Sequence, residues 1–458
     1  MKEQRRRLGA GAAILAASLA VGACSSLTPG SSSAGKPDQP ATIKKLTPDE
    51  VRALGDVTLT MTDFDPAGQG LGAALDKLVA QFHAAYPNVT VHRTSKDFNS
   101  YSKTIKLTLS EADAPDIAQA NVVMARTLVP AGLVRPLDGY YDAYAWRSRY
   151  PSSVLDLLRA KPDGKTLGDG KYWGQAIGGN MVGVYYNAAT LKKLGLSVPR
   201  TYGEFERDLQ VAKDNDVLPV QLGNLEQWPA NHVLSTLMNV TEDPQVVRDW
   251  IRGKPGATFE TPGIVAAAQT LRDWEQKGYL PANANGVTND RSIADFGAGQ
   301  GLFYITGSWQ IPRISAALKD DGGFFLLPPK TAGGPAAATG WLANPYTISA
   351  KSRKADLAAF FLDYLGGPAG TTTAVAGGFL PFGDLPAGFR QSRTASDVTA
   401  AWRAAIKDNG LVPYLDFATP SLGDAAFPAI QSVMAGKLQP TAFAHTVQEN
   451  WNDYHSGS

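Results

Sequence analysis

The first part of the chain alternates between stretches with strand periodicity and stretches with helical periodicity. Residues 57–64 alternate apolar and threonine residues, which predicts a β-strand. Apolar residues then recur at helical spacing over residues 71–86, and Pro87 ends this predicted helix. Residues 89–91 begin a second strand. A strand, a helix and a strand in this order predict a parallel pair with a right-handed crossover, and hence an α/β fold.

Later segments continue the same alternation. Residues 183–186 predict a strand. Thr201 and Glu204 have the spacing of a capping box, which predicts that a helix begins there. Residues 357–365 carry the apolar spacing of another helix, and no internal repeat of fixed period is present.

Composition agrees with a folded protein that has a sizeable core. The 458 residues are 44% hydrophobic and 19% charged, which excludes a mainly disordered or fibrous chain and predicts two large lobes or about three domains. With 43 Lys and Arg against 42 Asp and Glu, we expect no nucleic acid partner. Cys24 is the only cysteine, so intramolecular disulfides and cysteine-based zinc sites are excluded.

The amino-terminal segment has the features of an export signal. Basic residues precede an apolar stretch, residues 8–20, that is too short to span a bilayer. Residues 21–24, Val-Gly-Ala-Cys, resemble a bacterial lipobox, in which the cysteine is acylated and residues 1–23 are removed. The alternative is an ordinary signal peptide with an incidental cysteine, and three consecutive arginines leave twin-arginine export open.

The segment after this signal is predicted to be a tether. Residues 24–55 are largely rich in Ser, Pro, Gly, Lys and Thr, as flexible linkers are. We expect lipid on Cys24 to hold a folded body at the extracellular or periplasmic face of the cell membrane.

The sequence motifs of known catalytic sites are mostly incomplete or absent. Gly68-x-Gly70-x-x-Ala73 follows a strand, but the next strand supplies no acidic partner for a nucleotide ribose. The five histidines form no His-Glu-x-x-His pair, and no Gly-x-Ser-x-Gly elbow occurs. We therefore expect a protein that is not an enzyme and has no cofactor and no metal. A glycosidase with two carboxylates stays open, because its acids can lie far apart in sequence.

Tryptophans fall into two groups. Those predicted to lie in the core, because they occur in helical apolar patterns, are Trp250, Trp274, Trp402 and Trp451. Trp228, Trp309 and Trp341 lie beside Gly, Pro or Asn in loop-like contexts. A ring in such a place either packs inward or presents a flat face to a sugar, whose hydroxyl edge also needs side chains that donate and accept hydrogen bonds.

Several stretches in the same order together resemble a known family. They are residues 75–91, Tyr101 with residues 114–117 and 131–138, residues 184–205, residues 296–309 with their final Gly-Ser-Trp, residues 345–349 and residues 377–381. In these stretches the chain resembles family 1 extracellular solute-binding proteins of ABC importers, which include maltose-binding protein. Residues 299–302 depart from the family pattern, which puts only the local packing in doubt.

This resemblance implies a class II periplasmic-binding-protein-like fold, in which two lobes close by a hinge on a ligand in the cleft between them. The first lobe would comprise residues 56–175 plus 345–366, and the second residues 176–344 plus 367–458. The implied partners are a sugar or oligosaccharide and the permease subunits of an ABC transporter, and we expect a monomer. A secreted carbohydrate hydrolase, or a binding protein for a glycerophosphodiester or a peptide, is the alternative.

Candidate ligand-binding residues of the first lobe follow two strands. Asp63, Phe64 and Asp65 end the first strand, and Gln119 and Asn121 follow the strand that Ile117 begins. Ligands in open α/β sheets bind beyond the carboxyl ends of strands, so these side chains would face the cleft. The alternative is that the aspartates cap the next helix and that Gln119 and Asn121 form turns.

The candidates of the second lobe come from the resemblance. Trp309, in the Gly-Ser-Trp motif, would be the main plate on which a sugar stacks. Asn180 would supply a hydrogen-bonding side chain, and Trp228 and Trp341 would be further plates, with Asn344 close in sequence to Trp341.

Overall fold

The protein is described here from a computed structural model that covers residues 43–68, 70–343 and 345–456, without the side chains of residues 152, 153 and 369. The predicted signal, residues 1–23, therefore lies outside the described residues, as do Cys24, the tether up to residue 42 and the ligand-binding candidate Asn344.

The first sheet contains the predicted strand–helix–strand unit. Its order is β11 (Tyr346–Ile348), β3 (Ile117–Gln119), β1 (Val57–Asp63) and β2 (Val89–Ser95). Strand β1 is parallel to both β2 and β3, and only β11 runs antiparallel to its neighbour. The carboxyl ends of β1 and β3 consequently lie at the same edge of the sheet.

The second sheet is centred on a long buried strand. Its order is β12 (Leu411–Val412), β10 (Ala338–Leu342), β6 (Gly179–Asn187), β8 (Phe303–Gly307) and β7 (Val220–Gln221), and β9 (Gly322–Phe325) also pairs with β6. All residues of β6 are buried. A separate ribbon joins β4 (Arg159–Ala160) to β5 (Lys171–Tyr172).

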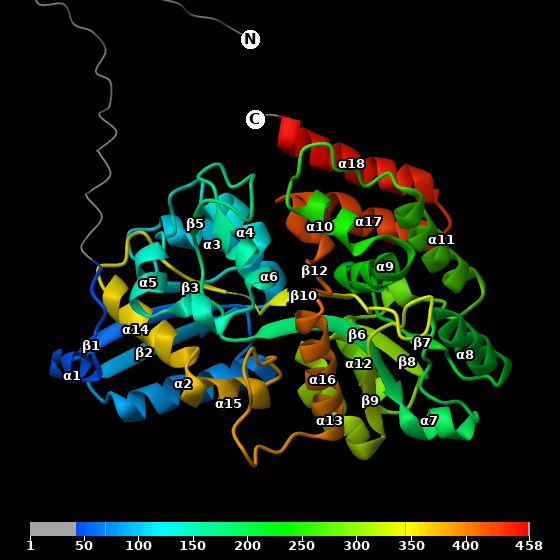
Figure 1. Ribbon diagram of the computed structural model, residues 1–458, viewed down its shortest axis with the longest axis horizontal. Helices are drawn as coiled ribbons and strands as arrows, with labels where there is room; N and C mark the ends of the chain where they lie inside the picture. Colours follow the sequence, from blue (N-terminus) through cyan, green and yellow to red (C-terminus); the bar gives the residue numbers. More distant parts are fainter. Residues whose placement is uncertain (1–42, 69, 344, 457–458) are drawn as a thin grey trace, which may run out of the picture. The chain divides into compact units, whose positions relative to one another are not determined.

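The chain passes between the two sheets more than once. It enters the second sheet with β6, returns to the first with β11, and enters the second again with β12. Figure 1 shows the blue strands of the first sheet beside the green strands of the second. Two α/β sheets joined by crossing segments form the two-lobe fold, so the predicted fold class is confirmed.

Helices cover the first sheet. Helix α2 (Gly70–Ala85) makes the crossover from β1 to β2 and packs against α14 (Ala355–Leu365) and α15 (Pro368–Ala376). The Phe82 ring of α2 meets the Phe361 ring of α14 edge-on at 4.8 Å. The remaining helices near this sheet are α1 (Pro48–Ala53), α3 (Phe98–Ser110), α4 (Val122–Leu128), α5 (Asp138–Ala143), α6 (Ser152–Leu155), and the 3-10 helices η1 (Trp146–Arg149) and η2 (Asp156–Leu158).

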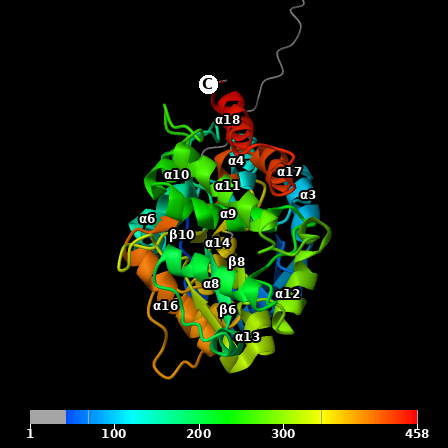
Figure 2. The same cartoon turned by 90° about the vertical axis from the view of Figure 1, so that its right-hand side faces the viewer.

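The second sheet is covered on both faces. On one face, α9 (Trp228–Thr241) packs against α11 (Pro262–Gln276) and α17 (Leu422–Met434), and α18 (Pro440–Ser456) packs on both. On the other, α13 (Ile311–Leu318) packs against α16 (Arg393–Lys407). Figure 2 shows these two groups with β6 and β8 between them. The others are α7 (Ala188–Lys193), α8 (Tyr202–Asp214), α10 (Pro244–Ile251), α12 (Asn289–Gly297), η3 (Ala284–Gly286), η4 (Ser308–Gln310), η5 (Lys319–Asp321) and η6 (Leu415–Ala418).

Local sequence signals explain several of these elements. The capping box predicted for α8 is confirmed, since Thr201 Oγ1 accepts from the Glu204 amide at 3.1 Å and Glu204 Oε2 accepts from the Thr201 amide at 3.3 Å. The four tryptophans predicted to lie in the core are all buried, at 8% exposure or less: Trp250, Trp274, Trp402 and Trp451.

A buried arginine connects the two halves. Arg126, on α4, is 2% exposed and donates to the carbonyl oxygens of Phe417 at 2.8 Å and Ile251 at 2.9 Å, both in helices that pack around the second sheet. It also donates to the carbonyls of Gly164 at 3.1 Å and Lys165 at 2.8 Å. Burial lowers its pKa to about 10. Helix α4 therefore contacts η6 through a charge balanced by carbonyl dipoles.

Candidate functional site

The carboxyl ends of β1 and β3 carry a group of polar side chains, here called the β1 cluster: Asp63, Asp65, Arg93, Gln119 and Tyr346. Arg93 comes from β2, beside β1, and Tyr346 from β11, beside β3. Strand pairing thus brings together residues that are far apart in sequence. All five are buried or largely buried.

Asp63 and Arg93 form a two-pronged ion pair. Arg93 Nε and Nη2 each donate to a different carboxylate oxygen of Asp63 at 2.6 Å, and the two side chains are 0% and 6% exposed. Arg93 Nη1 also donates to Asp76 at 2.5 Å, and Nη2 donates to the carbonyl of Asp65. The sequence predicted that Asp63 binds a ligand, but both of its carboxylate oxygens accept hydrogen bonds from Arg93.

Gln119 ties the end of β3 to the end of β1. Its Oε1 accepts from the Phe64 amide at 3.0 Å, and its Nε2 donates to Asp65 Oδ2 at 2.8 Å. Burial raises the pKa of Asp65 to about 6. Among the described residues no hydrogen bond reaches Asp65 Oδ1, so this carboxylate oxygen has no protein partner there.

Phe64 and Asn121 lie next to this cluster. The Phe64 ring packs edge-on against Phe98 at 5.2 Å and Tyr101 at 5.3 Å. Asn121 caps α4, since its Oδ1 accepts from the Met124 amide at 2.9 Å. In the part of the chain that is described, the Asn121 Nδ2 takes part in no hydrogen bond. Asn121 therefore has the turn-forming role, and its Nδ2 donor has no partner among the described residues.

The second sheet presents a different group, here called the aromatic cluster: Trp228, His232, Trp309 and Tyr414. The His232 ring lies at the centre, with centroid distances of 5.1 Å to Trp228, 5.4 Å to Trp309 and 5.7 Å to Tyr414. Trp228 and His232 are one turn apart on α9, Trp309 lies in η4, and Tyr414 precedes η6. Trp228 and Trp309 are each partly exposed.

The Gly-Ser-Trp motif has a steric basis. A side chain on Gly307 would place its Cβ 2.1 Å from atoms of the Trp309 ring. The indole consequently lies against bare backbone, a close approach that only glycine permits. Gly307 therefore sets the position of the Trp309 ring.

Asn180 joins the aromatic cluster through Tyr414. The Tyr414 hydroxyl donates to Asn180 Oδ1 at 2.8 Å, and both residues are buried. Asn180 lies on β6 directly opposite Trp341 of β10. The sequence placed Asn180 and Trp309 in one site, and the Tyr414 ring, 6.5 Å from Trp309, links them.

Trp341 is placed differently from the other two loop tryptophans. It is 2% exposed, its Nε1 donates to the carbonyl of Val154 at 2.9 Å, and its ring meets Phe417 edge-on at 5.7 Å and Trp173 at 6.3 Å. Of the two alternatives that the sequence left open, Trp341 shows inward packing. Its ring faces are covered by protein.

Sequence reasoning missed polar residues of α9 and of the segment before α17. Burial lowers the pKa of His232 to about 3, which keeps its imidazole neutral, and raises the pKa of Asp416 to about 6. Asn231, the residue before His232, donates to Asp416 Oδ1 at 3.5 Å. The only sequence signal was the four-residue spacing of Trp228 and His232, which puts both on one helix face.

Contacts between helices bring the elements of the two clusters together. Helix α2, which follows the end of β1, contacts η4, which holds Trp309. Helix α4, which begins after Asn121, contacts η6, which follows Tyr414. The elements that follow β1 and β3 therefore contact the elements that carry or flank two residues of the aromatic cluster.

A sequence profile of the bacterial extracellular solute-binding protein family matches residues 77–385. The chain belongs to this family. This solute-binding protein is also similar to the multiple sugar-binding protein of Streptococcus mutans, with 25% identity over 302 residues that cover 64% of this chain and 68% of that relative.

Solved structures share the fold of this solute-binding protein. A chitin oligosaccharide binding protein superposes with a TM-score of 0.74 at 21% identity, over 88% of this chain and 100% of that one. The solute-binding protein RafE, solved in complex with raffinose, superposes with a TM-score of 0.68 at 18% identity, over 87% of this chain and 100% of that one. At these identities the likeness establishes the two-lobe fold alone.

Other features of the described residues bear on the kind of protein. Within residues 43–68, 70–343 and 345–456, no group of three or more His, Cys, Asp or Glu side chains could hold a metal ion. Over the same ranges, no helix is both long enough and apolar enough to cross a membrane.

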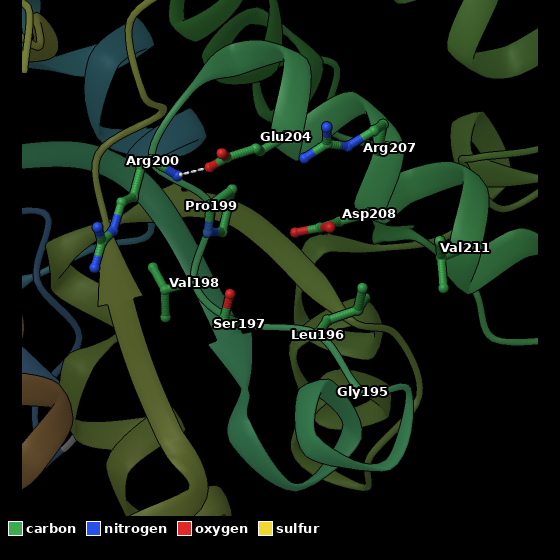
Figure 3. A pocket seen from close by; sticks show the side chains of 10 residues that line it. All are labelled: Gly195, Leu196, Ser197, Val198, Pro199, Arg200, Glu204, Arg207, Asp208 and Val211. Atoms are coloured by element: carbon green, nitrogen blue, oxygen red, sulfur yellow. Dashed lines mark hydrogen bonds between the residues drawn. The ribbon is translucent and has the colours of Figure 1, made fainter. Parts of the chain in front are cut away.

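A surface pocket also lies away from the two clusters. It has a volume of about 780 Å³ and is lined by residues 195–200 and one face of α8, including Glu204, Arg207 and Asp208 (Figure 3). None of the ligand-binding candidates from the sequence lines it.

Proposed function

We propose that this solute-binding protein captures a sugar or oligosaccharide between the β1 cluster and the aromatic cluster. The observation that supports the proposal is the contact of α2 with η4 and of α4 with η6, because these elements flank the hydrogen-bonding groups of the first sheet and the indole and phenol rings of the second. A sugar needs both, an apolar plate for its C–H face and donors and acceptors for its hydroxyls. The names of the similar proteins, a multiple sugar-binding protein and a chitin oligosaccharide binding protein, agree with this proposal.

The charges favour an uncharged ligand. The Arg93 guanidinium is taken up by Asp63 and Asp76, and that of Arg126 by backbone carbonyls. The carboxyl groups beside the two clusters, Asp65 and Asp416, would repel a phosphate or a carboxylate when ionised. We therefore expect that a glycerophosphodiester binds poorly, because its negative charge would lie near carboxyl groups and not near a free cation among the described residues.

The residues proposed to contact the ligand are those with unused polar atoms or open ring faces. They are Asp65, Asn121, Asn180, Trp228 and Trp309, and Asn344 remains a candidate from the sequence. We propose that Phe64 and Gln119 support this site, because Phe64 packs against Phe98 and Tyr101 and both amide atoms of Gln119 are bonded within the protein. Asp63 and Trp341 are left out, because protein atoms occupy the Asp63 carboxylate and cover the Trp341 ring.

We further propose that the lobes comprise residues 56–175 plus 345–366 and residues 176–344 plus 367–458, and that they close by a hinge. Because α15 packs on α2, its contacts support assigning residues 367–376 to the first lobe as well. The closed form would deliver its ligand to the permease of an ABC transporter. Lipid on Cys24 would anchor the protein as a monomer at the extracellular or periplasmic face of the membrane.

Calorimetry with a panel of maltose, raffinose, chitobiose, xylobiose and monosaccharides tests the ligand. We expect at least one of these sugars to bind, and no binding of glycerol phosphodiesters or peptides. Binding of a phosphodiester alone would refute the proposal. Chromatography of each sugar after incubation with the protein tests for catalysis, and we expect no hydrolysis product.

Membrane attachment is tested separately with a Cys24→Ser variant in cells. We expect the wild-type protein to sediment with membranes and to carry acyl groups by mass spectrometry, and the variant to be released. A wild-type protein found without lipid would refute the anchor but leave sugar binding intact.

A further inference from the structure

The centre of the aromatic cluster is a histidine that no neighbouring protein group binds. His232 is 7% exposed and is surrounded by the rings of Trp228, Trp309 and Tyr414. Among the described residues, no hydrogen bond reaches either nitrogen of its imidazole. A polar side chain more than nine-tenths buried is ordinarily bonded, so its lack of a partner calls for an explanation.

The two imidazole nitrogens differ in their surroundings. Nδ1 is enclosed by protein and has no partner there. Nε2 also has no partner but is not enclosed, so a bound molecule can reach it. A neutral imidazole carries one N–H and one lone pair. Because a buried N–H without an acceptor is strongly disfavoured, the proton belongs on Nε2.

The neighbouring polar groups of α9 are in the same condition. Asn231 Oδ1 and Ser235 Oγ are enclosed without a partner in the described chain, one turn apart on the helix. Asn231 makes a single long contact through Nδ2, at 3.5 Å to Asp416. This stretch of α9 is therefore a wall of polar side chains that the protein itself leaves unbonded.

We propose that His232 determines specificity by donating a hydrogen bond from Nε2 to an oxygen of the bound ligand. The three surrounding rings hold the imidazole in place and leave Nε2 as its accessible nitrogen. This donor needs an acceptor oxygen on the ligand, which a hydroxyl or ring oxygen of a neutral sugar supplies. This inference rests on the proposed function and adds to it a residue, an atom and the direction of one hydrogen bond.

Two substitutions distinguish the effect of the Nε2–H donor of His232 from the effect of the shape of its ring. His232→Phe keeps a ring in the aromatic cluster but removes both nitrogens, and His232→Gln keeps an N–H near the position of Nε2. With a sugar that binds the wild-type protein, we expect His232→Phe to weaken binding about 3- to 10-fold, the range of one net hydrogen bond. We expect His232→Gln to bind more tightly than His232→Phe.

The matched control is His92→Phe, since His92 is exposed on β2 and lies outside both clusters. We expect calorimetry to give this variant the wild-type affinity, and urea unfolding to show that each variant folds. Nitrogen-15 NMR of histidine-labelled protein reports the tautomer directly. We expect a protonated Nε2 and an unprotonated Nδ1 in His232, and a shift of the Nε2 resonance when the sugar binds.

The possible failures are distinguishable. Equal binding by folded His232→Phe and wild type overturns the inference and leaves the proposed function standing. Equal losses in the Phe and Gln variants, or a proton found on Nδ1, likewise overturn the donor role. If the wild-type protein binds no sugar in the panel, the proposed function fails and this inference fails with it.

Discussion

The β1 cluster and the aromatic cluster are both buried and polar, yet they use their hydrogen-bonding groups in opposite ways. In the β1 cluster, Arg93, Asp63 and Gln119 bind one another and the backbone, and the Tyr346 hydroxyl is the enclosed group there that has no partner in the described chain. In the aromatic cluster and the helix that supports it, His232 and Asn231 leave enclosed atoms unbonded.

The difference indicates that one cluster mainly stabilises the fold and the other mainly serves binding. A satisfied network fixes the shape of the chain, because each group is already held by a protein partner. A network with unused donors and acceptors is poorer for stability but is available to a ligand. We therefore expect damage to the β1 cluster to appear mainly in folding, and damage to the aromatic cluster to appear mainly in binding.

The largest expected effect comes from breaking the buried ion pair. Arg93→Met leaves Asp63 buried without its cation, which should cost about 3–5 kcal/mol in free energy of unfolding, measured in urea. The double variant with Asp63→Asn should recover part of this loss, because no uncompensated charge remains. A single variant as stable as the wild type would show that the network does not fix the fold.

The next effect concerns Asp416. Its folded-state pKa, raised to about 6 from the ordinary 3.8, favours the protonated form. That contribution to stability is fully present below pH 3.8 and is lost as the pH rises through about 6. Asp416→Asn should therefore stabilise the protein at pH 7.5 by up to about 3 kcal/mol, with the gain shrinking toward pH 4. Thermal unfolding across this pH range measures it.

Asp208, in the pocket of Figure 3, is a matched control for Asp416. Burial raises its pKa to about 6 as well, and no hydrogen bond from the described residues reaches its carboxyl group. Asp208→Asn should show the same stability profile and leave sugar affinity unchanged, whereas Asp416→Asn should also weaken binding. Equal affinities in the two variants would place Asp416 outside the binding site.

Removing the proposed stacking plate should have an intermediate effect. Trp309→Ala should weaken sugar binding by more than about 1 kcal/mol, or roughly fivefold, in calorimetry. Because the ring is partly exposed, the loss of unfolding free energy should be smaller than for a buried tryptophan. Trp309→Phe should restore part of the affinity. Unchanged binding by Trp309→Ala would assign this ring to packing alone.

The smallest effect tests a residue that has a role in both folding and binding. Asn121→Ala removes the cap of α4 and should cost about 1 kcal/mol of stability. Asn121→Asp keeps the capping oxygen and should be as stable as wild type, but it lacks the Nδ2 donor. If Asn121→Asp binds sugar as tightly as wild type, the side chain serves only as a cap.

The sequence predicted the parts of the fold that depend on local signals. The alternation of residues 57–91 and the capping box at Thr201 specify elements over short distances, and the structure contains both. The fold class and the carboxyl-end placement of Asp65 and Gln119 followed from the order of the elements.

The sequence alone could not predict which residues the site residues contact. Arg93 reaches Asp63 only because β2 pairs with β1 in a register that sets Arg93 opposite Met61. His232 meets Trp309 and Tyr414 because three segments far apart in sequence converge on α9. Trp341 and Trp309 share a loop-like context in the sequence, and only packing separates the covered ring from the partly exposed one.

The buried guanidinium of Arg126 limits how the two sheets can rotate against each other. Its positive charge is balanced by carbonyl oxygens of residues 164 and 165 on one side and of residues 251 and 417 on the other. Pulling α4 away from residues 251 and 417 would leave that charge in a medium of low dielectric with half its ligands gone. If the lobes close by the proposed hinge, we expect an axis that passes close to Arg126, because such a rotation would keep these hydrogen bonds.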